Sequence, residues 1–221
     1  ANFLIAPASL DPVEVPPGKA HKIYGALVAS LRYPGTDRRG LLPLLDKALE
    51  TPSVIARFVE MCPREPKNCP LSSALLALQN CSSQLAFDEI VQWLSGQAKP
   101  QAEMRAYMKK PPPLYVTGQT AREYSYLLTG ISTLATMLGY SGLAALIDES
   151  EHYSLLRAAQ RERADSFFKA MIVSALGLNN GRIDALTIPD NPRSEYPISY
   201  ASEPHLLFLF LARLSSAPFL L

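Results

Sequence analysis

Two adjacent carboxylates, Asp148 and Glu149, are the side chains of this 221-residue sequence that are best placed to do chemistry. They directly follow residues 143–147, an apolar run without alternation. Such a run is typical of a strand buried on both faces of a parallel sheet, and ligands bind at the carboxyl edge of such sheets. A simpler interpretation stays open, in which Asp148 or Ser150 only caps the next helix.

An apolar strand that ends in Asp-Glu is the Walker B pattern of P-loop ATPases. Asp148 can hold Mg²⁺, which bridges the phosphates of ATP, and Glu149 can polarise the water that attacks the γ-phosphate. ATP and Mg²⁺ are therefore the expected ligands. A phosphate-binding loop of the form GxxxxGK[ST] is absent from the sequence. The nearest fragment, Gly18-Lys19, has no Ser or Thr after the lysine and no glycine five residues before it.

Three apolar runs and a series of amphipathic segments predict an α/β fold with parallel strands. The first run is expected to stop at Pro7, and Gly139 suits the end of a long helix. The predicted strands are residues 3–6, 143–147 and 205–212. The predicted helices are residues 19–31, a segment from about 41, and residues 51–62, 71–80, 84–94, 120–138 and 154–176.

These elements predict a single domain over residues 1–221, with a three-layer P-loop-NTPase-like parallel sheet. Residues 19–138 form a large and mostly helical insertion between the first strand and the second. Residues 139–221 carry the strand with the acidic pair, a helix and the last strand.

Residues 139–151, with the sequence GYSGLAALIDESE, resemble the Walker B region of the ATP-binding proteins of bacterial BREX phage-defence systems. These are large P-loop proteins similar to AAA+ ATPases. The resemblance extends over residues 21–27, 31–35, 151–156 and 206–212. It implies that this chain lies downstream of the phosphate loop and that activity depends on the missing loop. The missing initiator Met also suggests a piece of a longer protein.

The same resemblance implies that the strand normally lying between the two central ones, residues 143–147 and 205–212, is absent. Its absence would leave unpaired edges inside the sheet unless another segment supplies it or the strand order is rearranged. The last strand resembles one that carries a sensor residue, which makes Ser215 or Ser216 a candidate contact to the nucleotide. A simple turn before Pro218 is the alternative for these serines.

Several other polar residues have a second interpretation as ordinary surface. Arg157, Arg161 and Arg163 could act across a subunit interface or contact nucleic-acid phosphates, but a solvated mixed-charge helical face is favoured. His152 could orient a catalytic group or make a helix-start contact. The formal net charge of +1 gives no whole-chain nucleic-acid footprint, so DNA binding rests on the arginines alone.

The three cysteines, Cys62, Cys69 and Cys81, are an odd number without a CxxC pair, so we expect reduced thiols and no zinc site. The sequence shows no secretory signal and no apolar stretch of about 20 residues, the length a membrane helix needs. We therefore expect a cytoplasmic protein without a membrane segment.

Two functions from different classes remain. The first is an ATPase domain fragment of a phage-defence protein, whose partners would be other defence-system proteins or further copies of itself. The alternative is a non-catalytic scaffold or protein-interaction module with a degenerate nucleotide fold, in which the helical insertion is the partner surface.

Overall fold

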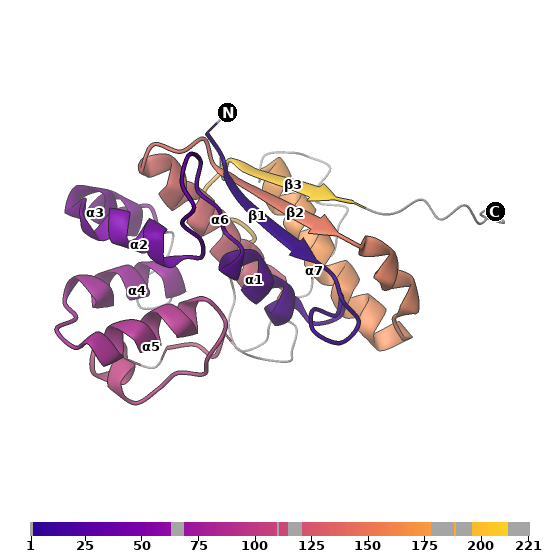
Figure 1. Ribbon diagram of the computed structural model, residues 1–221, viewed down its shortest axis with the longest axis horizontal. Coiled ribbons are helices and arrows are strands. Elements are labelled where there is room, and N and C mark those ends of the chain that lie inside the picture. The colour runs from indigo at the N-terminus through magenta and orange to yellow at the C-terminus, as the bar shows by residue number, and fades with distance from the viewer. Residues whose placement is uncertain are drawn as a thin grey trace.

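The computed structural model describes residues 2–62, 69–109, 111–114, 121–177, 188 and 196–211. Its three strands form one parallel sheet in the order β1-β2-β3, so the predicted α/β class with parallel strands is confirmed (Figure 1). The strands are β1 (Leu4–Ser9), β2 (Leu143–Asp148) and β3 (Leu206–Phe210).

The first strand is longer than predicted, because it runs through Pro7 and ends at Ser9. The N–H groups of Leu4 and Leu10 donate to carbonyls on the β2 side, whereas the N–H of Ile5 points to the opposite side. Pro7 shares the outward orientation of Ile5, since bonding direction alternates along a strand. The donor that Pro7 lacks is therefore not needed for pairing with β2.

The two strands that were expected to be central, β2 and β3, are direct neighbours, with Leu143 opposite Leu206 and Ile147 opposite Phe210. The expected gap between them does not exist. β2 also pairs with β1 along its whole length, from Leu143 to Asp148. The unpaired edges that such a gap would leave are therefore not present between β2 and β3.

The helices follow the predicted order, and most of their ends lie within about two residues of the predicted positions. Prolines occupy the first turn of α2, α3 and α4, where a missing N–H costs no hydrogen bond. Between β1 and β2 lie α1 (Ala20–Ala29), α2 (Leu42–Leu49), α3 (Pro52–Glu60), α4 (Pro70–Gln79), α5 (Gln84–Leu94), the 3₁₀ helix η2 (Glu103–Ala106) and α6 (Ala121–Met137). Between β2 and β3 lie the 3₁₀ helix η3 (Ser150–Leu155) and α7 (Ala158–Leu176).

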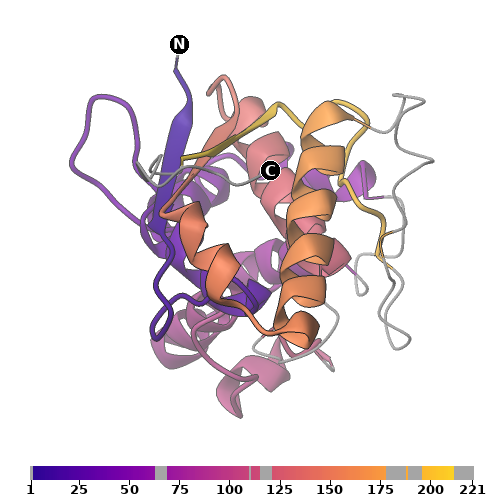
Figure 2. The same cartoon turned by 90° about the vertical axis from the view of Figure 1, so that its right-hand side faces the viewer.

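One face of the sheet is covered by α1, α6 and α7, which also pack against one another (Figure 2). Strands that follow one another in sequence and in space, joined by right-handed crossovers, place their connecting helices on the same face. On the other face Ile5, Leu207 and Leu209 are 42–46% exposed. The second helical layer expected there is not formed by any helix that the structure describes.

Helix α6 is buried on nearly all sides, because it lies between the sheet and the helices of the insertion. Its buried hydroxyls bond to main-chain atoms. Thr129 Oγ1 accepts the N–H of Tyr200 at 3.0 Å, and Ser132 Oγ donates to the carbonyl of His205 at 2.9 Å. Ser132 also accepts the N–H of Leu143 at 3.1 Å, so one side chain binds the beginnings of both β2 and β3.

The beginnings of these two strands approach each other most closely at Gly142, which has φ +132°. A Cβ added there would lie 2.1 Å from the carbonyl oxygen of His205, a distance that no side chain can occupy. Only glycine therefore allows β3 to start beside β2.

We predict that Gly142→Ala lowers the free energy of unfolding by more than about 3 kcal/mol, because the methyl group would force the two strands apart. Urea denaturation measures this loss. Gly139→Ala is the matched control: its φ is +91° but no atom lies within 4 Å of the added Cβ. This variant should lose only about 1 kcal/mol of unfolding free energy, because alanine is strained at a positive φ. If both variants lose the same unfolding free energy, the contact between Gly142 and the carbonyl of His205 is not what makes glycine necessary.

A buried carboxyl group, Glu123, lies near the beginning of α6 and is 4% exposed. Burial raises the pKa of Glu123 to about 7, from an ordinary value of 4.5. Between these two pH values the folded chain keeps a proton that the unfolded chain has lost. Stability therefore falls as the pH rises through this window.

We predict that the unfolding free energy declines by about 3 kcal/mol between pH 4.5 and pH 7 because of Glu123, and that Glu123→Gln removes this decline. Urea denaturation at a series of pH values is the measurement. Glu162→Gln, at an exposed position of α7, removes the same charge and should leave the decline in place. If the unfolding free energy of the Glu123 variant still falls with pH as it does in the wild type, Glu123 is not the cause of the decline.

The cysteines differ from the prediction of three free thiols. Cys62 and Cys69, near the facing ends of α3 and α4, form a disulfide, and Cys81 is free. The phenol of Tyr126 donates a hydrogen bond to the sulfur of Cys69. An odd number of cysteines did not reveal this pair, because the pairing depends on how two helices pack.

Candidate functional site

The acidic pair lies at the carboxyl end of the central strand, as predicted. Asp148 is the last residue of β2 and is exposed. One oxygen of its carboxylate accepts the N–H of Glu149 at 2.8 Å. Glu149 adopts a left-handed backbone conformation, with φ 57° and ψ 36°, and the chain then enters η3. Because of this turn, the strand ends at Asp148, and Glu149 does not continue its extended backbone.

The carboxylate of Glu149 is held by residues from two elements. Ser9, the last residue of β1, donates its hydroxyl to Glu149 Oε2 at 3.1 Å. Ser9 lies opposite Asp148 in the register of the sheet, which is why it reaches the next residue. Nε2 of His152 lies 3.7 Å from the same oxygen. One carboxylate oxygen therefore has a neutral donor and a titratable group beside it.

A third carboxylate, that of Asp11, follows the end of β1 and lies near His152. It accepts the N–H groups of Val13 and Glu14, each at 2.7 Å. The bond from Glu14 and then the bond from Val13 hold the pKa of Asp11 below its ordinary value, and the charge of His152 acts in the same direction. Asp11 thus stays ionised while it fixes the turn that follows β1.

The ends of β2 and β3 are also joined. The N–H of Leu211 donates to the carbonyl of Ile147 at 2.7 Å. The N–H and the hydroxyl of Ser150 both donate to the carbonyl of Leu211, at 3.2 and 3.0 Å. All three strands therefore end next to the acidic pair. Ser215 and Ser216 lie outside the described residues, so their role as nucleotide contacts stays a prediction.

The three arginines do not converge on the acidic pair. The guanidinium of Arg161 donates to the carbonyls of Leu156 and Ser154, at 3.4 and 3.5 Å, and lies over the ring of Tyr153. Arg157, the residue before α7, and Arg163, on α7, are both exposed. Arg161 therefore has a structural position at the entrance to α7, and the other two lie on a solvated face.

Ser9 and Asp11 are site residues that the sequence did not predict. Both follow Pro7, the predicted end of the first strand, whereas the strand runs on to Ser9. The signal was present in the alternation Leu4, Ala6 and Ala8, whose side chains are all buried. His152 was named as a residue that could orient a catalytic group, and the structure places it beside Glu149.

Within the described ranges, no group of three or more His, Cys, Asp or Glu side chains could hold a metal ion. Asp148 offers one hard, exposed carboxylate. Mg²⁺ is commonly held by one or two carboxylates together with waters and substrate phosphates, so a single carboxylate is compatible with it. At this edge of the sheet, the described residues therefore offer one exposed carboxylate, Asp148, next to the hydrogen-bonded carboxylate of Glu149.

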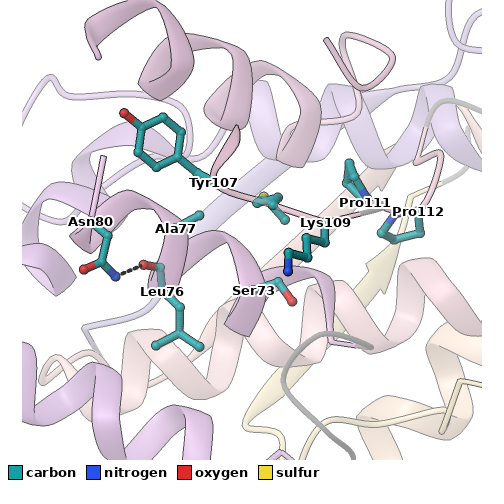
Figure 3. Close-up of a pocket in the computed structure, with 9 residues that line it drawn as sticks. Ser73, Leu76, Ala77, Asn80, Tyr107, Lys109, Pro111 and Pro112 are labelled. Carbon is teal, nitrogen blue, oxygen red and sulfur yellow. Dashed lines mark hydrogen bonds between the residues drawn. The ribbon is translucent and has the colours of Figure 1, made fainter. Parts of the chain in front are cut away.

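A pocket of about 380 Å³ lies in the helical insertion, on the side of the molecule away from the acidic pair (Figures 1 and 3). The amide of Asn80 donates to the carbonyl of Leu76 at 2.8 Å, so it is already bonded within α4. Four of its nine lining residues carry polar side chains, and five do not. Its lining consists of Ser73, Leu76, Ala77, Asn80, Tyr107, Met108, Lys109, Pro111 and Pro112.

The fold and the site together define an α/β protein with an acidic pair at the carboxyl edge of a parallel sheet. Residues 73–179 match the family described as BREX system ATP-binding protein BrxC/D. The matched segment runs from α4 to the end of α7 and includes the acidic pair. The resemblance inferred from the sequence is thus confirmed over these residues. No curated protein and no solved structure matches the chain significantly.

None of the helices in the described part of the chain combines the length and the apolar character needed to cross a bilayer.

Proposed function

We propose that this chain supplies the water-activating and metal-binding half of an ATPase site in a phage-defence protein. The observation that carries the proposal is the position of Asp148 and Glu149 at the end of the central strand, with the carboxylate of Glu149 held by Ser9. The match of residues 73–179 to a family of BREX system ATP-binding proteins supports ATP as the ligand. The sheet would then be part of a P-loop, AAA+-like fold.

In this proposal Asp148 and Glu149 have different roles because their surroundings differ. Asp148 is exposed and would hold Mg²⁺, whose charge when bound offsets that of the nucleotide phosphates. Glu149 would accept a proton from water as the water oxygen bonds to the γ-phosphorus. The bond between that phosphorus and the bridging oxygen of ADP breaks in the same reaction.

Ser9 would be a positioning residue, because it acts on the nucleotide only through Glu149. A carboxylate at a strand end can rotate freely, and a general base must lie within hydrogen-bond reach of its water. The hydroxyl of Ser9 restricts one oxygen of Glu149 and leaves the other available. His152 lies 3.7 Å from the same oxygen and would limit its rotation further.

The phosphates themselves need a Gly-rich loop with a lysine, which this sequence lacks. We therefore propose that residues 1–221 are inactive alone and that the phosphate loop comes from another segment. Hydrolysis would drive a conformational change in a larger defence assembly, with other defence-system proteins or further copies of this chain as partners.

Glu149→Gln should lower kcat for ATP hydrolysis by about 100-fold or more and leave ATP binding intact, because the amide cannot accept the proton. The measurements are phosphate release and calorimetric ATP binding, on the polypeptide as its gene encodes it. Glu151→Gln is the matched control two residues away and should keep wild-type turnover. Hydrolysis that is unchanged in the Glu149 variant would refute the role assigned to this residue.

Ser9→Ala should lower kcat about 10-fold with little change in KM for ATP, because an unrestrained carboxylate spends less time at the water. Ser9→Thr keeps the hydroxyl and should restore most of kcat. Steady-state kinetics of the three proteins gives both constants. A parallel loss in the alanine and threonine variants would indicate a packing role and not a positioning one.

The absent phosphate loop favours a second candidate function, a non-catalytic scaffold or interaction module. The helical insertion with the pocket of α4 would then be its partner surface. Calorimetry separates the two functions, since a scaffold would show no ATP binding even in the gene-encoded polypeptide. DNA binding has only the exposed Arg157 and Arg163 to support it, and a steep fall of affinity with salt would be its signature.

A further inference from the structure

The pocket in the helical insertion has one wall that is formed by a single side of α4. Ser73, Leu76, Ala77 and Asn80 line this wall, and their spacing of three and four residues places them on one side of the helix. Leu75, on another side of α4, is fully buried in the core. The helix therefore presents apolar side chains to the pocket in addition to those that it packs in the core.

The opposite wall is held in place by hydrogen bonds to neighbouring elements. The indole Nε1 of Trp93, on α5, donates to the carbonyl of Pro112 at 2.8 Å. The N–H of Met108 donates to the carbonyl of Met104, in η2, at 2.9 Å. Pro111 and Pro112 have a restricted φ, which stiffens this wall further. The pocket is therefore pre-formed, as small-molecule sites usually are.

The polar side chains of the lining leave the pocket with one charged corner. The amide of Asn80 donates within α4, and the phenol of Tyr107 is bonded to the hydroxyl of Ser82 at 3.0 Å. The ammonium of Lys109 points toward the hydroxyl of Ser73 (Figure 3). In the described part of the chain, no carboxylate is paired with Lys109. This corner therefore carries a positive charge beside an apolar lining.

We propose that the pocket binds a small organic monoanion, a carboxylate that is joined to an apolar body. The carboxylate would lie beside the ammonium of Lys109, at the corner that Ser73 shares. The apolar body would lie against Leu76, Ala77 and Met108. This inference does not rest on the proposed ATPase function, because the pocket lies away from the acidic pair.

The charge and the size of the pocket select this class of ligand. A single ammonium complements a single negative charge, whereas a phosphate monoester carries about two charges and three strong acceptor oxygens. The volume of about 380 Å³ is near the lower end of ligand pockets, so a body of about one or two rings fills it. The thioether of Met108 favours an aromatic body, because sulfur makes favourable contacts with ring edges.

The test is methyl NMR of the 221-residue chain with ¹³C-labelled methionine, titrated with 4-phenylbutanoate and with its uncharged amide. Met108 reports the pocket, and Met171 of α7 reports the rest of the core. The acid should shift the Met108 signal with a Kd of about 1 mM, as expected for a ligand of this size, and leave Met171 in place. The amide should bind about 10-fold more weakly, because it lacks the charge-assisted bond.

Three variants separate the charge from the apolar lining. Lys109→Gln should weaken binding of the acid about 10-fold and leave the amide unchanged, so that the two ligands bind equally. Lys99→Gln removes an exposed charge outside the pocket and should keep the preference for the acid. Ala77→Leu fills the pocket and should abolish the shift for both ligands, with urea denaturation as the check that this variant is folded.

A carboxylate on an apolar body can come from a free acid or from the last residue of a partner polypeptide. The peptide acetyl-Gly-Gly-Phe, with a free carboxyl terminus, separates these sources. Binding at least about 10-fold tighter than that of 4-phenylbutanoate would assign the pocket to a polypeptide terminus, because the added backbone would also be bound. Weaker binding would assign the pocket to a free acid.

Three results would overturn the inference. Equal binding of acid and amide to the wild-type chain would reject the role of the charge. A Met108 shift that persists in folded Ala77→Leu would place the ligand outside the pocket. No shift of Met108 with about 10 mM of either ligand would mean that the pocket does not bind this class. None of these results depends on ATP, so the ATPase proposal stands or fails separately.

Discussion

The close approach of β2 and β3 at Gly142 is the constraint on which the candidate site depends. The carbonyl of His205 occupies the space of a missing side chain at Gly142, and Ser132 of α6 bonds to both strands at this point. These contacts fix the register in which the strands begin. Because a parallel ladder keeps its register, they also determine that Ile147 lies opposite Phe210 at the far end.

The buried helix α6 transmits this constraint to the rest of the molecule. It lies against the sheet on one side and the insertion on the other, so the hydroxyls of Thr129 and Ser132 have no access to water. The hydroxyls of Thr129 and Ser132 instead form hydrogen bonds with main-chain atoms of the segment before β3, and Ser132 also bonds to the first residue of β2. Unpaired hydroxyls at such depth would cost about 1–3 kcal/mol each, so these bonds favour one packing arrangement over others. The helical insertion therefore stabilises the sheet that carries the acidic pair.

Local patterns predicted the elements well and their relations less well. The continuous apolar run of β2 and the proline-started helices were predictable, because burial and the missing N–H of proline act within a few residues. The extension of β1 through Pro7 was not, since it depends on which side of the strand lacks a partner. The strand order and the Cys62–Cys69 bond were also missed, because both arise from contacts between distant segments.

The same distinction applies to the candidate site. Asp148 and Glu149 were visible in the sequence because the acidic pair and its strand are contiguous. Ser9 was not, because it lies 140 residues from Glu149 and comes close only through the register of β1 with β2. When a site is assembled from the ends of several strands, the sequence therefore reveals the residues that are adjacent in the chain and not those that the register brings together.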